Sequence, residues 1–193
     1  DKPITRGEVA KLLVRAIGNV VNDETGASLF LKAWSEPLFP DLPQNHPYYW
    51  HIRLLANKAG DPEGERIARA IGDVQVLTSK ADGNFHPDDP VTRAELATMI
   101  GLLLEGKDIP CVDDTSPFKD VPEGSAHERY ITCLKVKGYV DNYPDGEFKP
   151  NNFVTRAEAA KLLAPLIDLT TTQPAASMAD HQAGVVSATQ AGE

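Results

Sequence analysis

One five-residue motif occurs three times in the chain, as Ile4-Thr5-Arg6-Gly7-Glu8, Val91-Thr92-Arg93-Ala94-Glu95 and Val154-Thr155-Arg156-Ala157-Glu158. Apolar residues spaced three or four apart follow each copy, which is the pattern of one face of a helix. A Thr followed three residues later by Glu is a capping box, in which each side chain accepts a hydrogen bond from a backbone N–H at the helix start. The motif therefore predicts three helices that begin alike, and the chain is an internal repeat.

The residues upstream of the motif repeat as well. Residues 81–87 align with 144–150 at a constant offset of 63 (155 − 92), and both stretches contain an Asp-Gly turn, a Phe and a Pro. Further upstream, Phe39-Pro40-Asp41 aligns with Phe118-Lys119-Asp120 at an offset of 79 (118 − 39), so the second copy carries 16 extra residues (79 − 63). A full repeat is predicted to run from a Phe-x-Asp loop through a helix and an Asp-Gly turn to the capped helix. This order of elements predicts a mainly α fold.

The alignments divide the chain into repeats and connections. We expect three repeat regions: the second half of a first, truncated repeat at 1–18, a second repeat at 39–104 with an insertion near 60–75, and a third at 118–168. The remaining segments are predicted to be a connector at 19–38, a linker at 105–117 and a low-complexity tail at 169–193. Short helices are predicted near 29–34 and at 61–72, where Pro62 and Gly72 supply start and stop signals.

Composition and motifs exclude several function classes. The formal net charge of −9 argues against nucleic-acid binding, which needs a basic face. No apolar run approaches the roughly 20 residues of a membrane helix, so no membrane insertion is expected. The five His residues lack the spacing of a metal-binding helix, and the chain contains no phosphate-binding loop, dinucleotide fingerprint or nucleophile elbow. We therefore predict no enzyme, no catalytic or metal-ligating residues and no cofactor.

The two cysteines, Cys111 and Cys133, allow two interpretations. Their spacing fits neither a CxxC motif nor a zinc cluster. They are either separate thiols, with Cys133 on a helix face, or a disulfide formed in an oxidising compartment.

The Arg of the repeated motif is the candidate functional residue. Arg6, Arg93 and Arg156 each occupy the first helical position, where the helix dipole is unfavourable for a cation. An Arg beside free N-terminal amides would make an anion site, because its planar guanidinium grips carboxylate or phosphate. The alternative is a structural Arg that bridges to an acidic loop residue such as Asp41 or Asp120.

The order of these motifs resembles that of a known family. A Phe-x-Asp loop, a helix, Gly-Tyr-Val, Pro-Asp-Gly-x-Phe-x-Pro and Val-Thr-Arg-Ala-Glu is similar to the S-layer homology (SLH) repeat, most fully from Phe118 to Ile167. The resemblance implies a pseudo-threefold helical assembly in which one helix per repeat meets the others at the axis. It also implies a secreted protein of the bacterial cell surface that binds a secondary cell-wall polysaccharide, often one carrying ketal-linked pyruvate.

The resemblance also assigns candidate ligand residues. Those in grooves between neighbouring repeats would be Arg6, Arg93, Arg156, Gly83 and Gly146.

The aromatic residue that often opens the first helix in the family is replaced here by Pro47 and Ala126. Tyr49 and Trp50 lie close to the first of these positions and either stack on a sugar or belong to the core.

The first repeat also departs from the family, because its front half is missing; either the chain is trimmed or a neighbour completes the repeat. The alternative function is a structural repeat scaffold that mediates protein–protein assembly in a surface layer or filament, in which the partners would be other copies in a homo-oligomer or surface lattice.

Overall fold

The computed structural model describes residues 2–17, 38–56, 74–106, 111 and 118–171. Within these residues the regular elements are five helices: α1 (Arg6–Ala16), α3 (Tyr49–Ala56), α5 (Arg93–Gly106), α6 (Glu128–Val136) and α7 (Arg156–Thr171). The described residues form isolated β-bridges but no strand, so the predicted mainly α fold is confirmed. The predicted short helices near 29–34 and at 61–72 lie outside the described residues, as does most of the predicted linker and tail.

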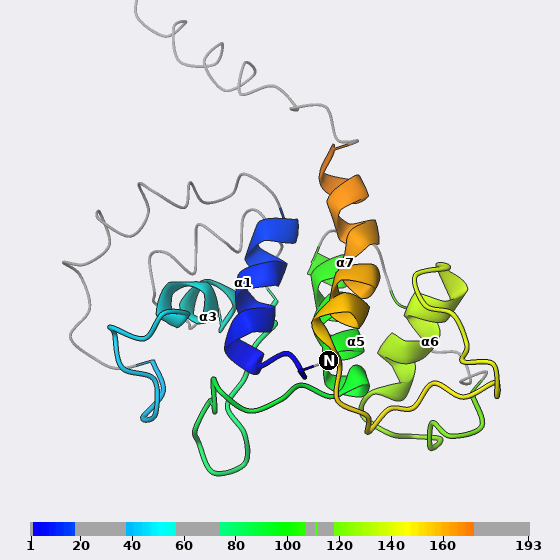
Figure 1. Cartoon of the computed structure of the whole chain (residues 1–193), viewed down its shortest axis with the longest axis horizontal. Coiled ribbons are helices and arrows are strands. Elements are labelled where there is room, and N and C mark those ends of the chain that lie inside the picture. The colour runs from blue at the N-terminus through cyan, green and yellow to red at the C-terminus, as the bar shows by residue number, and fades with distance from the viewer. Residues whose placement is uncertain (1, 18–37, 57–73, 107–110, 112–117, 172–193) are drawn as a thin grey trace, which may run out of the picture.

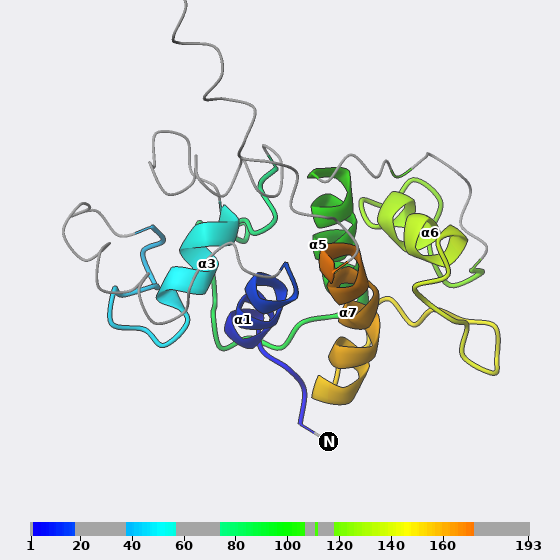
Figure 2. The same cartoon turned by 90° about the horizontal axis from the view of Figure 1, so that it is seen from above.

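The three helices that follow the repeated motif stand next to one another at the centre of the molecule. Figure 1 shows α1, α5 and α7 roughly upright, with α3 beyond α1 on one side and α6 beyond α5 on the other. The view from above in Figure 2 gives the same order. Helix α3 packs on α1, α6 packs on α5, and α7 packs chiefly on α1. The first helix of each repeat therefore covers the motif helix of the preceding repeat.

A closed ring of backbone hydrogen bonds joins the three copies of the motif. The amide of Ile4 donates to the carbonyl of Val154 at 2.8 Å, Val154 donates to Val91 at 2.9 Å, and Val91 donates to Ile4 at 3.0 Å. All three side chains are fully buried. Because a buried backbone group left unpaired is costly, this ring fixes the register in which the three helices begin.

Each motif helix starts with the capping box predicted from sequence. The Thr5 amide donates to Glu8 at 3.0 Å, and the Thr5 hydroxyl accepts from the Glu8 amide at 3.3 Å. The same reciprocal pair is formed by Thr92 with Glu95 and by Thr155 with Glu158.

The Phe-x-Asp loop holds the Asp-Gly turn of its own repeat. Asp41 accepts hydrogen bonds from the amides of Phe85 and His86, at 2.8 and 2.6 Å. Asp120 accepts the equivalent bonds from Phe148 and Lys149, at 2.9 and 2.7 Å. His86 and Lys149 have φ values of 56° and 62°, which is an unfavourable region for residues other than glycine. The carboxylates therefore stabilise a strained turn whose Phe is inserted into the core.

Cys111 and Cys133 form a disulfide, which decides between the two interpretations of the sequence. Their Cα atoms are 5.1 Å apart and they are separated by 22 residues. Both residues are buried, and Cys133 belongs to α6. A loop of this length is expected to add roughly 3 kcal/mol of stability by restricting the unfolded chain. The bond ties α6 to the segment that follows α5.

Candidate ligand-binding site

Two pockets occupy equivalent places between neighbouring motif helices. The first, here called the Lys80 pocket, has a volume of about 330 Å³ and is lined by Arg6, the segment 76–81 and residues of α5. The second, the Tyr143 pocket, has a volume of about 190 Å³ and is lined by Arg93, the segment 139–144 and residues of α7. Lys80 and Tyr143 are separated by the same 63 residues (143 − 80) that relate the second and third repeats. The repeat has therefore produced two copies of one site.

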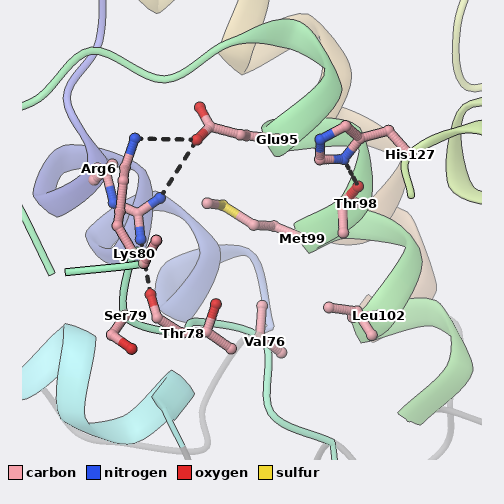
Figure 3. A pocket seen from close by; sticks show the side chains of 11 residues that line it. Arg6, Val76, Thr78, Ser79, Lys80, Glu95, Thr98, Met99, Leu102 and His127 are labelled. Atoms are coloured by element: carbon pink, nitrogen blue, oxygen red, sulfur yellow. Dashed lines mark hydrogen bonds and ion pairs between the residues drawn. The ribbon is translucent and has the colours of Figure 1, made fainter. Parts of the chain in front are cut away.

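Arg6 lies against the inner wall of the Lys80 pocket (Figure 3). Its Nε donates to the Phe85 carbonyl at 2.8 Å and its Nη2 donates to the Thr78 carbonyl at 2.9 Å. Its Nη1 lies 3.7 Å from Glu95, and the guanidinium stands 4.5 Å from the centre of the Phe85 ring. Burial lowers the pKa of Arg6, against the opposing effect of nearby carboxylates led by Glu95.

Arg93 repeats this arrangement in the Tyr143 pocket. Its Nε donates to the Phe148 carbonyl at 2.9 Å, and its Nη1 lies 3.7 Å from Glu158. The guanidinium stands 4.8 Å from the ring centres of both Tyr143 and Phe148. The Arg6 and Arg93 side chains are only 6% and 8% exposed. Most of each side chain is therefore part of the pocket wall, and a small part of it faces the pocket.

The structural alternative for the motif Arg named an acidic loop residue such as Asp41 or Asp120 as its partner, and the structure shows a different carboxylate. Asp41 and Asp120 bond to backbone amides, and each motif Arg instead reaches the capping-box Glu of the next motif helix. These pairs run around the ring as Arg6–Glu95, Arg93–Glu158 and Arg156–Glu8. The carboxylate is placed there by its own capping bonds, which explains why one Glu can serve both roles.

The expectation of free amides beside the Arg is also corrected for α1 and α5. The amides of Arg6 and Gly7 donate to the carbonyls of Asp89 and Pro87, at 2.9 and 2.8 Å. The equivalent amides of Arg93 and Ala94 donate to Asn152 and Pro150, at 2.9 and 3.0 Å. The turn of the next repeat therefore occupies these helix ends, and an anion in either pocket would contact side chains.

Arg156 differs from the other two copies. Its side chain is 65% exposed and pairs with Glu8 at 2.6 Å. It lines neither the Lys80 pocket nor the Tyr143 pocket.

The remaining predicted site residues do not line either pocket. Gly83 and Gly146 form the Asp-Gly turns, where φ values of 83° and 80° require glycine. Tyr49 is fully buried and its hydroxyl accepts a bond from Arg53, so it belongs to the core. Trp50 is partly buried and packs edge-on against Tyr49.

Sequence reasoning missed the residues just before the Asp-Gly turn. Lys80 and Tyr143 face the two pockets, and Thr78 and Asp141 line them from equivalent positions. Extending the alignment at the offset of 63 by a few positions would have found them, as positions where the two repeats differ in charge.

Lys80 and Arg6 share one carboxylate. The Lys80 ammonium lies 3.3 Å from Glu95, which Arg6 also approaches (Figure 3). Burial raises the pKa of Glu95, but the hydrogen bond from the Thr92 amide and the charges of Lys80 and Arg6 outweigh it, so the pKa is lowered overall. Glu95 is therefore ionised at neutral pH and pairs with both cations of the pocket.

The described part of the chain offers no cluster of three or more His, Cys, Asp or Glu side chains suited to a metal ion. None of its helices combines the length and the apolar character needed to cross a membrane.

Comparisons with known proteins match the repeated part of the chain to a known domain. Residues 61–97 and 117–160 match the model of the S-layer homology domain. The chain is 32% identical over 165 residues to a cellulosome-anchoring protein of Acetivibrio thermocellus, a match that covers 84% of this chain and 32% of the relative. It is 31% identical over 105 residues to the surface-layer 125 kDa protein of Lysinibacillus sphaericus, covering 54% of this chain and 9% of the relative.

A third relative is an uncharacterized cell wall amidase of Bacillus anthracis. It is 27% identical over 164 residues, covering 85% of this chain and 25% of the relative. The chain thus spans a third or less of the length of these three proteins. With the repeated motif, the matching domain model and these relatives in agreement, the chain contains S-layer homology repeats.

Proposed function

We propose that this chain holds a secreted protein on the bacterial cell envelope by binding an anionic secondary cell-wall polysaccharide in the Lys80 and Tyr143 pockets. The observation that carries the proposal is the pair of equivalent pockets, each with a motif Arg in its wall. An Arg has five N–H donors, and the bonds of Arg6 and Arg93 to backbone carbonyls leave donors for a ligand. The names of the cellulosome-anchoring and surface-layer relatives support a place at the cell surface.

The proposed role is non-catalytic. It is supported by the anchoring and surface-layer relatives, whose names describe attachment or a structural layer. The amidase relative is matched over a quarter of its length, so its name describes a protein with much sequence outside the matched region.

An assembly scaffold is the second candidate, and one observation favours it. Buried motif Arg residues that pair with internal carboxylates are what a scaffold would need, and Arg6 and Arg93 have such partners. The same two residues also line pockets, which favours a ligand. A scaffold would bind other copies of the chain through surfaces outside these pockets.

Plugging both pockets tests the proposal without disturbing the buried Arg residues. Ser79 and Asn142 are exposed, line the two pockets and occupy equivalent repeat positions. The Ser79→Trp/Asn142→Trp double variant is expected to lower binding to sacculi from the organism of the cellulosome-anchoring relative by at least about tenfold, or ~1.4 kcal/mol. Binding is measured by co-sedimentation before and after extraction of the wall polymer.

The matched control is Asn151→Trp, which changes an exposed polar residue outside both pockets in the same way. It should bind sacculi like the unmodified chain. Full binding by the double variant, with unchanged far-ultraviolet circular dichroism, would reject the pockets as the binding site and favour the scaffold.

A further inference from the structure

The two pockets have equivalent walls, but three equivalent lining positions differ in charge. In the Lys80 pocket these positions hold Thr78, Lys80 and Thr98. In the Tyr143 pocket they hold Asp141, Tyr143 and Lys161, each 63 residues further along. A neutral–cation–neutral set has therefore become an anion–aromatic–cation set.

The Lys80 pocket has more positive than negative charge on its walls. Its lining includes two cations, Arg6 and Lys80, and one carboxylate, Glu95. An ammonium group has three N–H donors, and Lys80 spends one on Glu95 at 3.3 Å. Its side chain is 37% exposed, so the remaining donors can reach a ligand. The pocket is therefore suited to a ligand that carries its own negative charge.

The opposite side of the Lys80 pocket adds neutral hydrogen-bonding groups. Figure 3 shows His127 and Thr98 across from Arg6 and Lys80, with Met99 between the two sides. The Thr98 hydroxyl and His127 Nδ1 are 2.8 Å apart, so each orients the other. A sugar unit could place its acidic group at Lys80 and its hydroxyls near Thr98.

The Tyr143 pocket has balanced charge. Its two cations, Arg93 and Lys161, are matched by Glu158 at 3.7 Å and Asp141 at 3.3 Å. Lys149 also lies near the Tyr143 ring, but it pairs with Asp145 at 2.8 Å. An additional anion would gain little net attraction in this pocket.

The Tyr143 pocket has aromatic rings where the Lys80 pocket has a net positive charge. Tyr139 and Tyr143 both line the pocket and both are half-buried, so part of each ring is accessible. The Tyr143 hydroxyl donates to Glu158 at 2.7 Å, which fixes the ring against the wall. An aromatic ring with an apolar face and a polar edge suits the C–H face of a neutral sugar.

We propose that the two pockets recognise different units of the polymer, a carboxylate-bearing sugar in the Lys80 pocket and a neutral sugar in the Tyr143 pocket. This inference rests on the proposed function, because it divides the same binding site into two specificities. Lys80 is the residue that determines the preference for acid. Tyr139 and Tyr143 supply the part of the binding that does not depend on the charge of the sugar.

The test compares two probes and two variants. The probes are wall polymer released from the same sacculi and the same polymer with its carboxyl groups converted to neutral amides. Amidation is expected to weaken binding to the unmodified chain roughly five- to tenfold, measured by isothermal titration calorimetry. The Lys80→Tyr variant should bind native polymer more weakly than the unmodified chain by about the same factor. It should bind amidated polymer within twofold of the unmodified chain.

Tyr139→Ala is the contrasting variant. It should weaken binding of native and amidated polymer by the same factor, roughly three- to tenfold. The conservative variant Lys80→Gln should behave as Lys80→Tyr does, which separates loss of charge from the added ring.

The outcomes separate this inference from the proposed function. The division of the pockets is overturned if Lys80→Tyr weakens both probes equally, or if amidation leaves binding unchanged while the Trp plugs abolish it. If the plugs have no effect on sacculus binding, the proposed function itself fails. Melting temperatures measured for every variant show whether a loss of binding reflects a loss of folded protein.

Discussion

Helices α1 and α5 bury a face that helix α7 exposes to solvent. The motif Arg is 6% exposed in α1, 8% in α5 and 65% in α7. Twelve positions after the motif Thr, Ile17 and Leu104 are 7% and 0% exposed, whereas Ile167 is 50% exposed. Five positions after the Thr, two alanines are fully buried and the third, Ala160, is exposed. The same sequence pattern therefore occurs in two different environments.

The difference follows from what covers each helix. The first helix of the next repeat, α3 or α6, packs on α1 or α5, and the turn after it accepts bonds from the amides at the helix start. None of the helices in the described residues covers α7 in this way. The repeated motif fixes where a helix begins, and the neighbouring repeat decides whether its Arg becomes a wall of a pocket or an exposed surface charge.

Replacing the motif Arg with Ala should give the largest contrast between the helices. Arg93→Ala removes a buried hydrogen bond to the Phe148 carbonyl and one cation beside Glu158, so we expect a loss of about 2–3 kcal/mol in unfolding free energy. Arg156→Ala removes an exposed ion pair and should cost no more than ~0.5 kcal/mol. Urea denaturation followed by circular dichroism measures both values. Equal losses would mean that burial does not distinguish the two sites.

Local and long-range contacts explain which features the sequence predicted. The capping boxes were predictable because Thr92 and Glu95 lie three residues apart, so their bonding depends on the helix start alone. The roles of Asp41 and Asp120 were not, because they accept from amides 44 and 28 residues away. Those distances exceed any local pattern.

The candidate site was predicted in part for the same reason. Arg6 and Arg93 stand out in the sequence as cations at an unfavourable helix position, and both line pockets. The carbonyls that accept from the amides beside them belong to turns about 60 to 80 residues further along the chain. Local sequence patterns do not predict such distant acceptors, so these amides were expected to be free. Tyr49 is the opposite case, because it was a candidate ligand residue and lies instead in the core. Its place on its own helix directs the side chain inward.

A larger side chain at the covered surface should give the next largest contrast. A Cβ atom built at Gly101 would overlap the Tyr130 ring, because α6 packs closely on α5 there. Gly101→Val should therefore destabilise the protein by about 2 kcal/mol. The equivalent residue of α7, Ala164, is exposed, and Ala164→Val should cost about 0.5 kcal/mol through helix propensity alone. Thermal or urea unfolding of the two variants checks the difference, and a neutral Gly101→Val would contradict close packing of α6.

Lowering the pH should reduce the stability of the folded protein through Glu95, and this is the smallest of the predicted effects. Burial raises the pKa of Glu95, but the Thr92 amide and the charges of Lys80 and Arg6 lower it below its ordinary 4.5 in the folded chain. The unfolded state therefore binds more protons near that pH, so stability rises with pH. The stabilisation is present above pH 4.5 and is lost as pH falls through the folded-state pKa. Its size is expected to be below ~1 kcal/mol, since the carboxylate is partly exposed.

Two variants separate this contribution from other carboxylates. Glu95→Gln should flatten the acid side of the stability curve, measured by urea unfolding between pH 3 and 7 (a range set by the ordinary carboxyl pKa of about 4). Lys80→Gln should flatten it less, because it removes one of the cations that lower the Glu95 pKa and leaves the Thr92 bond and Arg6 in place. A Glu95→Gln curve parallel to that of the unmodified chain would show that Glu95 binds protons equally in both states. In that case the Arg6–Glu95 pair would stabilise the covered surface no more than the exposed Arg156–Glu8 pair stabilises α7.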